Sequence, residues 1–97
     1  MTRAFAFEAD LYEWSARRGW YMVDLPEDVS DAITAIPLPP KGFGSVKVRA
    51  SVGGTTWDTS IFPGSDRYIL VIGKAVRTAE GIEPGDRVSA SVEIVGT

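Results

Sequence analysis

Apolar and polar residues alternate along several short segments of the chain, which is the pattern of strands with one buried face. The alternation is clearest over residues 46–52 and 88–94, and a third alternating run covers residues 5–11. Two further segments, residues 20–25 and 55–62, are rich in the aromatic and β-branched residues that strands favour. The pattern therefore predicts a mainly β fold in which Val46, Val48, Val88 and Val92 face a shared interior.

A sixth strand is predicted over residues 68–72, where the apolar residues run without a break. A continuous apolar run is expected when both faces of a strand are covered. We therefore expect this strand to be the most buried one.

Turn and helix signals separate the predicted strands. Pro26 and the acidic residues after it suit the start of a helix, which must end before Pro37. Its inward stripe is predicted to be Val29, Ala32, Ile33 and Ile36. A second helix is predicted over residues 74–80, with Gly81 as a left-handed cap.

Glycines mark the tight turns of the chain. Gly53-Gly54 predicts a hairpin between two strands, and Glu83-Pro84-Gly85-Asp86 has the arrangement of a type II turn. Residues 20–25 are predicted to return as the hairpin partner of residues 5–11.

The chain contains a weak internal repeat. The segment that begins at Tyr21 aligns without a gap with the segment that begins at Tyr68, and both lead from a strand into a short helix. A run holding a tryptophan, Trp14 or Trp57, precedes each copy. Few positions are identical, so true duplication and a generic strand-to-helix pattern are both open explanations. We expect a small six-stranded, closed or partly open, antiparallel-rich β-barrel with two short helices and two similar β-β-α-β halves.

Composition supports one small domain over residues 1–97 and narrows its chemistry. The chain has 97 residues, 44% of them hydrophobic, which is enough for a single core. It contains no cysteine, which excludes disulfides, thiolate nucleophiles and cysteine-based metal sites. It also contains no histidine, the commonest general base and metal ligand near neutral pH. We therefore expect a protein that is not an enzyme and needs no metal or cofactor.

Charge and hydropathy indicate which partners and which cellular location to expect. The formal net charge of −3 argues against nucleic acid as a partner, since domains that bind phosphate backbones usually carry a basic surface. The first residues lack the continuous apolar stretch of a signal peptide, and no segment reaches the ~20 apolar residues that span a bilayer. We expect a cytoplasmic protein that does not bind membranes.

A series of scattered residues resembles the pattern of a known family. These residues are Trp14, Gly19-Trp20, Leu25-Pro26, Phe43-Gly44-Ser45, Gly54-Thr55-Thr56-Trp57, Thr59-Ser60, Phe62-Pro63, Lys74-Ala75-Val76-Arg77 and Gly85-Asp86. In this order they resemble the bacterial family catalogued as domain of unknown function 1905, over nearly the whole chain. The resemblance implies a closed or nearly closed β-barrel with short helices, and it implies no activity.

A narrower likeness concerns residues 25–29 and 76–88. These segments look like parts of the strand-helix-turn-strand unit of swapped-hairpin transition regulators and antitoxins. Proteins of that family build a DNA-binding barrel from two chains, and here two such units would lie in one chain.

Candidate binding residues are cationic or aromatic. Lys41 and Phe43 lie in a glycine-containing loop that could hold an anion, although a packing role for Phe43 is the alternative. A basic patch could be formed by Lys47 and Arg49 together with Lys74 and Arg77, or these side chains could simply be solvated. The tryptophans and tyrosines are expected mainly in the core, and Trp57 is the ring we expect at a ligand site if one is exposed.

Three functions remain open at this point. The leading hypothesis is a non-catalytic binding or interaction module that recognises a partner protein or a small anionic ligand. A nucleic-acid-binding barrel and an enzyme that uses carboxylates or a lysine are the alternatives. The protein could be a monomer or a homodimer, because a second copy could cover an exposed strand edge.

Overall fold

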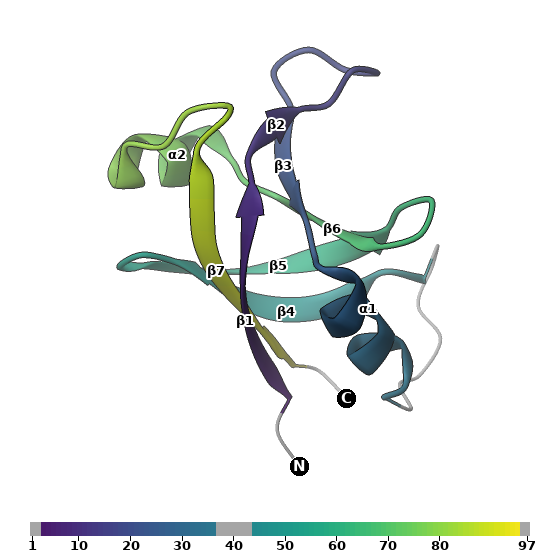
Figure 1. Ribbon diagram of the computed structural model, residues 1–97. Coiled ribbons are helices and arrows are strands. Elements are labelled where there is room, and N and C mark those ends of the chain that lie inside the picture. The colour runs from purple at the N-terminus through teal and green to yellow at the C-terminus, as the bar shows by residue number, and fades with distance from the viewer. Residues whose placement is uncertain (1–2, 37–43, 96–97) are drawn as a thin grey trace.

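The computed structural model describes residues 3–36 and 44–95, which form seven strands and two helices. In chain order these are β1 (Ala4–Asp10), β2 (Tyr12–Glu13), β3 (Tyr21–Asp24), α1 (Glu27–Thr34), β4 (Val46–Val52), β5 (Thr55–Pro63), β6 (Tyr68–Val71), α2 (Lys74–Glu80) and β7 (Arg87–Ile94). The strands form one antiparallel sheet in the order β1-β7-β4-β5-β6-β3-β2. Because β1 and β2 follow each other in the chain, the sheet curls into a nearly closed barrel (Figure 1).

The structure has one strand more than the six predicted, because the first strand bends at Leu11 into β1 and β2. The amide of Leu11 donates to the carbonyl of Asp86, and its own carbonyl accepts from the amide of Gly85. The predicted hairpin is correspondingly only partly right. β1 pairs with β7 along its whole length, and the short β2 alone pairs with β3.

The predicted turns are confirmed. The β4–β5 hairpin turns at Gly53-Gly54, with Val52 paired to Thr55 and a positive φ of 57° at Gly53. Gly81 ends α2 in the left-handed region, with φ 65°. Both positions need a backbone conformation that glycine adopts without a steric penalty.

Alternate side chains fill the barrel, as the pattern predicts. Val46, Val48, Val88 and Val92 are all buried. Burying a side chain of this size stabilises the fold by about 1.5–3 kcal/mol before entropy is counted. These four residues belong to one cluster with buried residues of β1, β3, β5, β6 and both helices, so the barrel has a single core; the buried Met22 of β3 lies outside this cluster.

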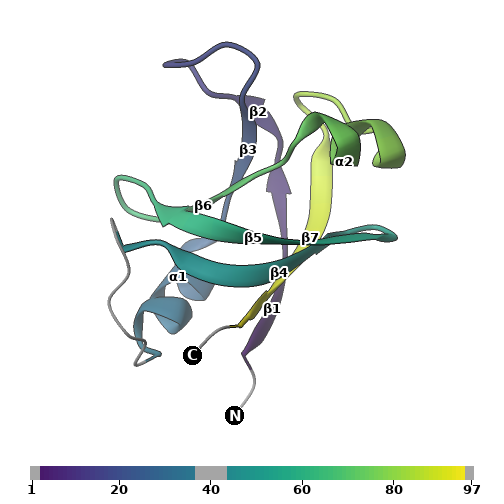
Figure 2. The same cartoon turned by 180° about the vertical axis from the view of Figure 1, so that it is seen from behind.

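The two helices lie at opposite ends of the barrel (Figures 1 and 2). α1 buries Val29 and Ile33, but Ala32, which was predicted to face inward, is exposed. Ser30 is buried in that helix instead. Its hydroxyl donates to the carbonyl of Leu25 at 3.3 Å and accepts from the amide of Tyr68 at 3.1 Å, so a polar residue is accommodated there.

A pseudo-twofold axis relates the two halves of the barrel, whose strands pair in the same way. β1/β2-β3-α1-β4 and β5-β6-α2-β7 have the same topology, and β3 pairs with β6 as β4 pairs with β7. In the alignment that places Tyr21 over Tyr68, Leu25 corresponds to Ile72. The amide of Ile72 donates to the carbonyl of Tyr21, and the amide of Leu25 donates to the carbonyl of Tyr68, both at 2.9 Å. The axis therefore passes between β3 and β6.

The prediction that β6 is the most buried strand is wrong. Leu70 is fully buried on its inner face, but Ile69 and Val71 on the outer face are only partly covered. The apolar run has a different cause from the one expected. Its outer residues form the floor of a surface cleft, because both helices lie at the barrel ends and leave this part of the wall open.

Candidate functional site

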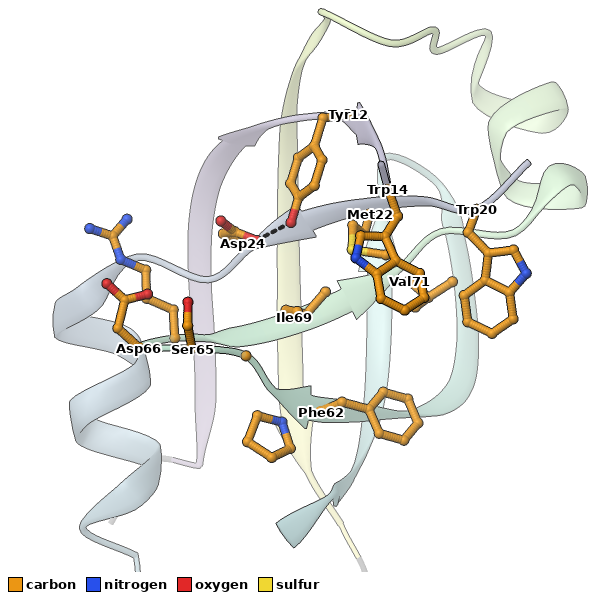
Figure 3. Close-up of a pocket in the computed structure, with 13 residues that line it drawn as sticks. Tyr12, Trp14, Trp20, Met22, Asp24, Phe62, Ser65, Asp66, Ile69 and Val71 are labelled. Carbon is orange, nitrogen blue, oxygen red and sulfur yellow. Dashed lines mark hydrogen bonds between the residues drawn. The ribbon is translucent and has the colours of Figure 1, made fainter. Parts of the chain in front are cut away.

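A cleft of about 490 Å³ crosses the outer face of β2, β3, β6 and β5. It lies between the β2–β3 loop, residues 14–20, and the β5–β6 turn, residues 64–67 (Figure 3). Its floor is apolar and consists of Met22, Ile69 and Val71. In the pairing register Met22 lies opposite Val71, so these two outward positions meet across the β3–β6 pair. We call this hollow the aromatic cleft.

Three exposed rings form one side of the aromatic cleft. Trp14 and Trp20 come from the β2–β3 loop, which is closed by a 2.7 Å hydrogen bond from the amide of Trp14 to the carbonyl of Trp20. Their ring centroids are 6.2 Å apart, with a tilt of 51°. Phe62 extends from β5, and Figure 3 shows the three rings gathered on the same side. The Arg17 guanidinium lies 4.7 Å from the centroid of the Trp20 ring, and this cation–π contact helps to fix the position of the ring.

The three rings leave much of their apolar surface exposed to solvent. Trp14, Trp20 and Phe62 have 41%, 39% and 44% of their surface exposed. Within residues 3–36 and 44–95 these are the large hydrophobic side chains that are exposed, and all three line the aromatic cleft. Clustered exposed apolar surface is typical of a binding site, whereas scattered exposed residues are not.

The opposite end of the cleft is polar and carries charge. The hydroxyl of Tyr12 donates to Oδ1 of Asp24 at 2.5 Å. Asp66 and Arg67 lie in the β5–β6 turn, and Arg67 forms an ion pair of 3.9 Å with Glu27 at the start of α1. The cleft therefore offers rings at one end and carboxylates at the other.

The Tyr12 hydroxyl remains protonated to high pH. Its burial first, and then the hydrogen bond and negative charge of Asp24, raise the pKa of Tyr12 well above the ordinary value. A folded-state pKa above the unfolded value gives stability that is complete below pH ~10 and is lost as the pH rises toward the folded-state pKa.

We therefore expect the free energy of unfolding to decrease more steeply above pH ~10 in the wild type than in Tyr12→Phe, which lacks this titration. Urea unfolding at several pH values between 8 and 11 measures the two slopes. Equal slopes for the two proteins would show that Tyr12 does not couple to folding.

The sequence-predicted site residues that the structure describes do not all lie together. Lys41 and Phe43 lie outside the described residues. Arg49 is on the outer face of β4, where its guanidinium lies 3.2 Å from Asp58 of β5. Trp57 pairs with the buried Ala50, so its ring is on the inner face and packs against the core. Arg49 and Trp57 therefore lie on opposite faces of the sheet.

Lys74 and Arg77 do come together on α2. They border a shallow hollow of about 370 Å³ with Tyr21 and the turn after the helix. The Arg77 guanidinium lies 4.1 Å over the Tyr21 ring and donates to the carbonyl of Ile72 at 2.7 Å. Arg77 corresponds to Ser30 in the repeat, which makes the matching bond to Leu25, so both side chains fasten a helix to the barrel.

Sequence reasoning missed the aromatic cleft. It expected the tryptophans mainly in the core, with Trp57 as the ring at a ligand site if one is exposed. The structure instead exposes Trp14 and Trp20, and Trp57 is partly buried against the core. Two sequence signals point to the cleft in retrospect. One is the unbroken apolar run at residues 68–72, and the other is the pair of tryptophans at the two ends of a polar loop.

Two features are absent from the described residues: a metal-binding group and a membrane-spanning helix. No group of three acidic side chains among residues 3–36 and 44–95 is placed to hold a metal ion. In the same part of the chain, neither helix has the length and apolar character that crossing a membrane requires.

The fold and the cleft together define a small β-barrel domain with an aromatic surface site. The profile of the family described as domain of unknown function (DUF1905) matches residues 7–92. Since the match covers nearly the whole chain, the protein belongs to the DUF1905 family. No curated protein matches it significantly.

Proposed function

We propose that this protein is a non-catalytic binding module and that the aromatic cleft is its ligand site. The cleft replaces the loop and basic residues expected from the sequence as the place where a ligand would bind. Its volume of about 490 Å³ falls in the range of about 300–1,000 Å³ that is usual for small-molecule sites.

One observation carries the proposal. The three exposed large rings of the described chain, Trp14, Trp20 and Phe62, come from two separate hairpins and meet at one hollow. Leaving them in water forgoes the free energy that their burial would supply, about 25 cal/mol for each Å². A ligand with an apolar body would recover part of that free energy.

The other placed residues support a ligand site elsewhere less well. Arg49 is paired with Asp58 and also lies opposite Glu93 of β7, so its surroundings are acidic. A duplex or single strand of nucleic acid would meet these carboxylates together with the cation. Arg77 is already engaged with Tyr21 and Ile72.

A neutral apolar probe tests the proposal. We expect 2-phenylethanol to bind the wild type with a dissociation constant in the millimolar range, and Phe62→Ala to bind it about three- to fivefold more weakly because one ring of the cleft is lost. Ligand-observed NMR titration measures both. Thr56→Ala, a change at an exposed position of the same strand outside the cleft, is the matched control and should bind like the wild type.

Equal binding by Phe62→Ala and the wild type would place the probe elsewhere. Absence of binding to the wild type at 20 mM probe would contradict the proposed function, since a preformed apolar cleft should retain a soluble aryl alcohol at that concentration.

A further inference from the structure

The polar end of the aromatic cleft has a net negative charge. Asp24 and Asp66 line it together with one cation, Arg67. The Arg67 guanidinium faces a third carboxylate, that of Glu27, at 3.9 Å. Two carboxylates thus line the polar end, its one cation is paired with a third carboxylate, and the net charge of −3 of the whole chain has the same sign.

Asp24 is the carboxylate that lies on one of the strands of the cleft floor. It lies on β3 opposite Ile69 of β6, so it borders the apolar floor directly. Tyr12 donates to one of its oxygens, which fixes the orientation of the carboxylate. An ionised carboxylate can accept several hydrogen bonds on its two oxygens, so one bond from Tyr12 leaves Asp24 able to accept from a ligand.

The aromatic end suits the apolar body of such a ligand. The Trp14 and Trp20 rings offer exposed apolar surface, and a cation, Arg17, already lies 4.7 Å from the centroid of the Trp20 ring, so a second positive charge is favoured at the other end. Figure 3 shows Trp14 and Trp20 on one side of the cleft floor and Asp24 and Asp66 on the other. A ligand that spans the floor would place an apolar body near the rings and a polar head near the carboxylates.

We propose that the aromatic cleft binds a small organic cation, a protonated amine on a flat apolar body. The ammonium group would donate to Asp24, and the body would lie on Met22, Ile69 and Val71 against the rings. This inference rests on the proposed function and adds the chemical class of the ligand. A small anion is disfavoured because Arg67, the cation of the lining, is opposed by Glu27.

Three probes of similar size separate charge from apolar contact. They are phenethylamine, which is a cation at pH 7, 2-phenylethanol, which is neutral, and 3-phenylpropionate, which is an anion. We expect phenethylamine to bind about three- to fivefold more tightly than the neutral probe, which is the gain from one partly exposed ion pair, and the anion to bind most weakly. The dissociation constants are measured from the shift of the Trp14 indole N–H signal at low ionic strength.

Asp24→Asn is the matched variant, because the amide keeps an oxygen that accepts from Tyr12 and loses the charge. It should bind phenethylamine no more tightly than 2-phenylethanol. Asp58→Asn, on the outer face of β5 away from the cleft, should keep the wild-type preference. For the wild type, 0.5 M NaCl should reduce the preference toward onefold, which gives a readout that needs no variant.

The outcomes separate this inference from the proposed function. Equal binding of all three probes, tighter binding of the anion, or an unchanged preference in Asp24→Asn would overturn the cation class while the cleft stays a binding site. No binding of any probe would overturn both. Concentration-dependent dimerisation with no probe binding would also overturn both, and would identify a second copy of the chain as the occupant.

Discussion

Replacing Leu70 with alanine is expected to lower the free energy of unfolding by about 3 kcal/mol. Leu70 is fully buried on β6, and its partner in the register is Val23 of β3, which is also fully buried. The two residues lie where the pseudo-twofold axis crosses the barrel, and Leu70 also pairs with Ile61 of β5, which is fully buried. The truncation removes buried apolar surface and leaves a cavity that the paired strands cannot collapse into without breaking their register.

The neighbouring residue provides the control for this prediction. Ile69 faces the aromatic cleft and is only partly buried, so Ile69→Ala should cost about 1 kcal/mol or less. Urea unfolding followed by far-UV circular dichroism measures both variants. A smaller loss for Leu70→Ala than for Ile69→Ala would mean that the inward and outward faces of β6 have been assigned the wrong way round.

Trp14→Ala is expected to weaken binding of phenethylamine by about tenfold or more while lowering the free energy of unfolding by less than about 1.5 kcal/mol. The ring has 41% of its surface exposed and contacts Trp20 at a centroid distance of 6.2 Å. Its loss removes a wall of the cleft and also frees Trp20 to move. The backbone bond from Trp14 to Trp20 needs no side chain and remains.

Trp57→Phe should have the opposite effects on stability and binding. The Trp57 ring packs against the core on the inner face of β5, so the substitution should lower the free energy of unfolding and leave the affinity of the folded protein for phenethylamine unchanged. The affinity is measured by NMR titration and the stability by urea unfolding, for both variants. A loss of affinity in Trp57→Phe with none in Trp14→Ala would place the ligand inside the barrel and not in the aromatic cleft.

Much of the fold could be predicted because strand alternation is a local property. The period of two in residues 46–52 and 88–94 is set by which side chains face the core, and those side chains are buried. The glycines that end α2 and turn the β4–β5 hairpin are equally local signals. The pairing of β1 with β7 is not local. It joins the two ends of the chain, and the alternating pattern alone does not identify which strands pair.

The aromatic cleft could not be predicted for a related reason. The presence of a tryptophan in the sequence does not tell whether its ring is buried or exposed. Its exposure depends on which other elements of the fold lie over the ring. Trp14 and Phe62 are distant in sequence and meet because β3, β6 and β5 are neighbours in the sheet. The ion pair of Arg49 with Asp58 likewise could not be predicted, because it depends on the register that places Asp58 opposite Arg49.

The pseudo-twofold axis relates the two sides of the cleft without making them alike. By register and alignment Tyr12 corresponds to Phe62, and Asp24 corresponds to Val71. One half of the barrel therefore supplies the hydroxyl and the carboxylate where the other supplies a phenyl ring and an aliphatic side chain. This difference gives the cleft a polar end and an apolar end on a repeated scaffold, which orients a ligand that has both characters.

A crystal structure of the protein with phenethylamine tests the central claim most directly. The account predicts the phenyl ring against Trp14, Trp20 and Phe62, with the ammonium nitrogen within about 3 Å of an oxygen of Asp24. A ligand found beside Lys74 and Arg77, or inside the barrel next to Trp57, would contradict the assignment of the binding site.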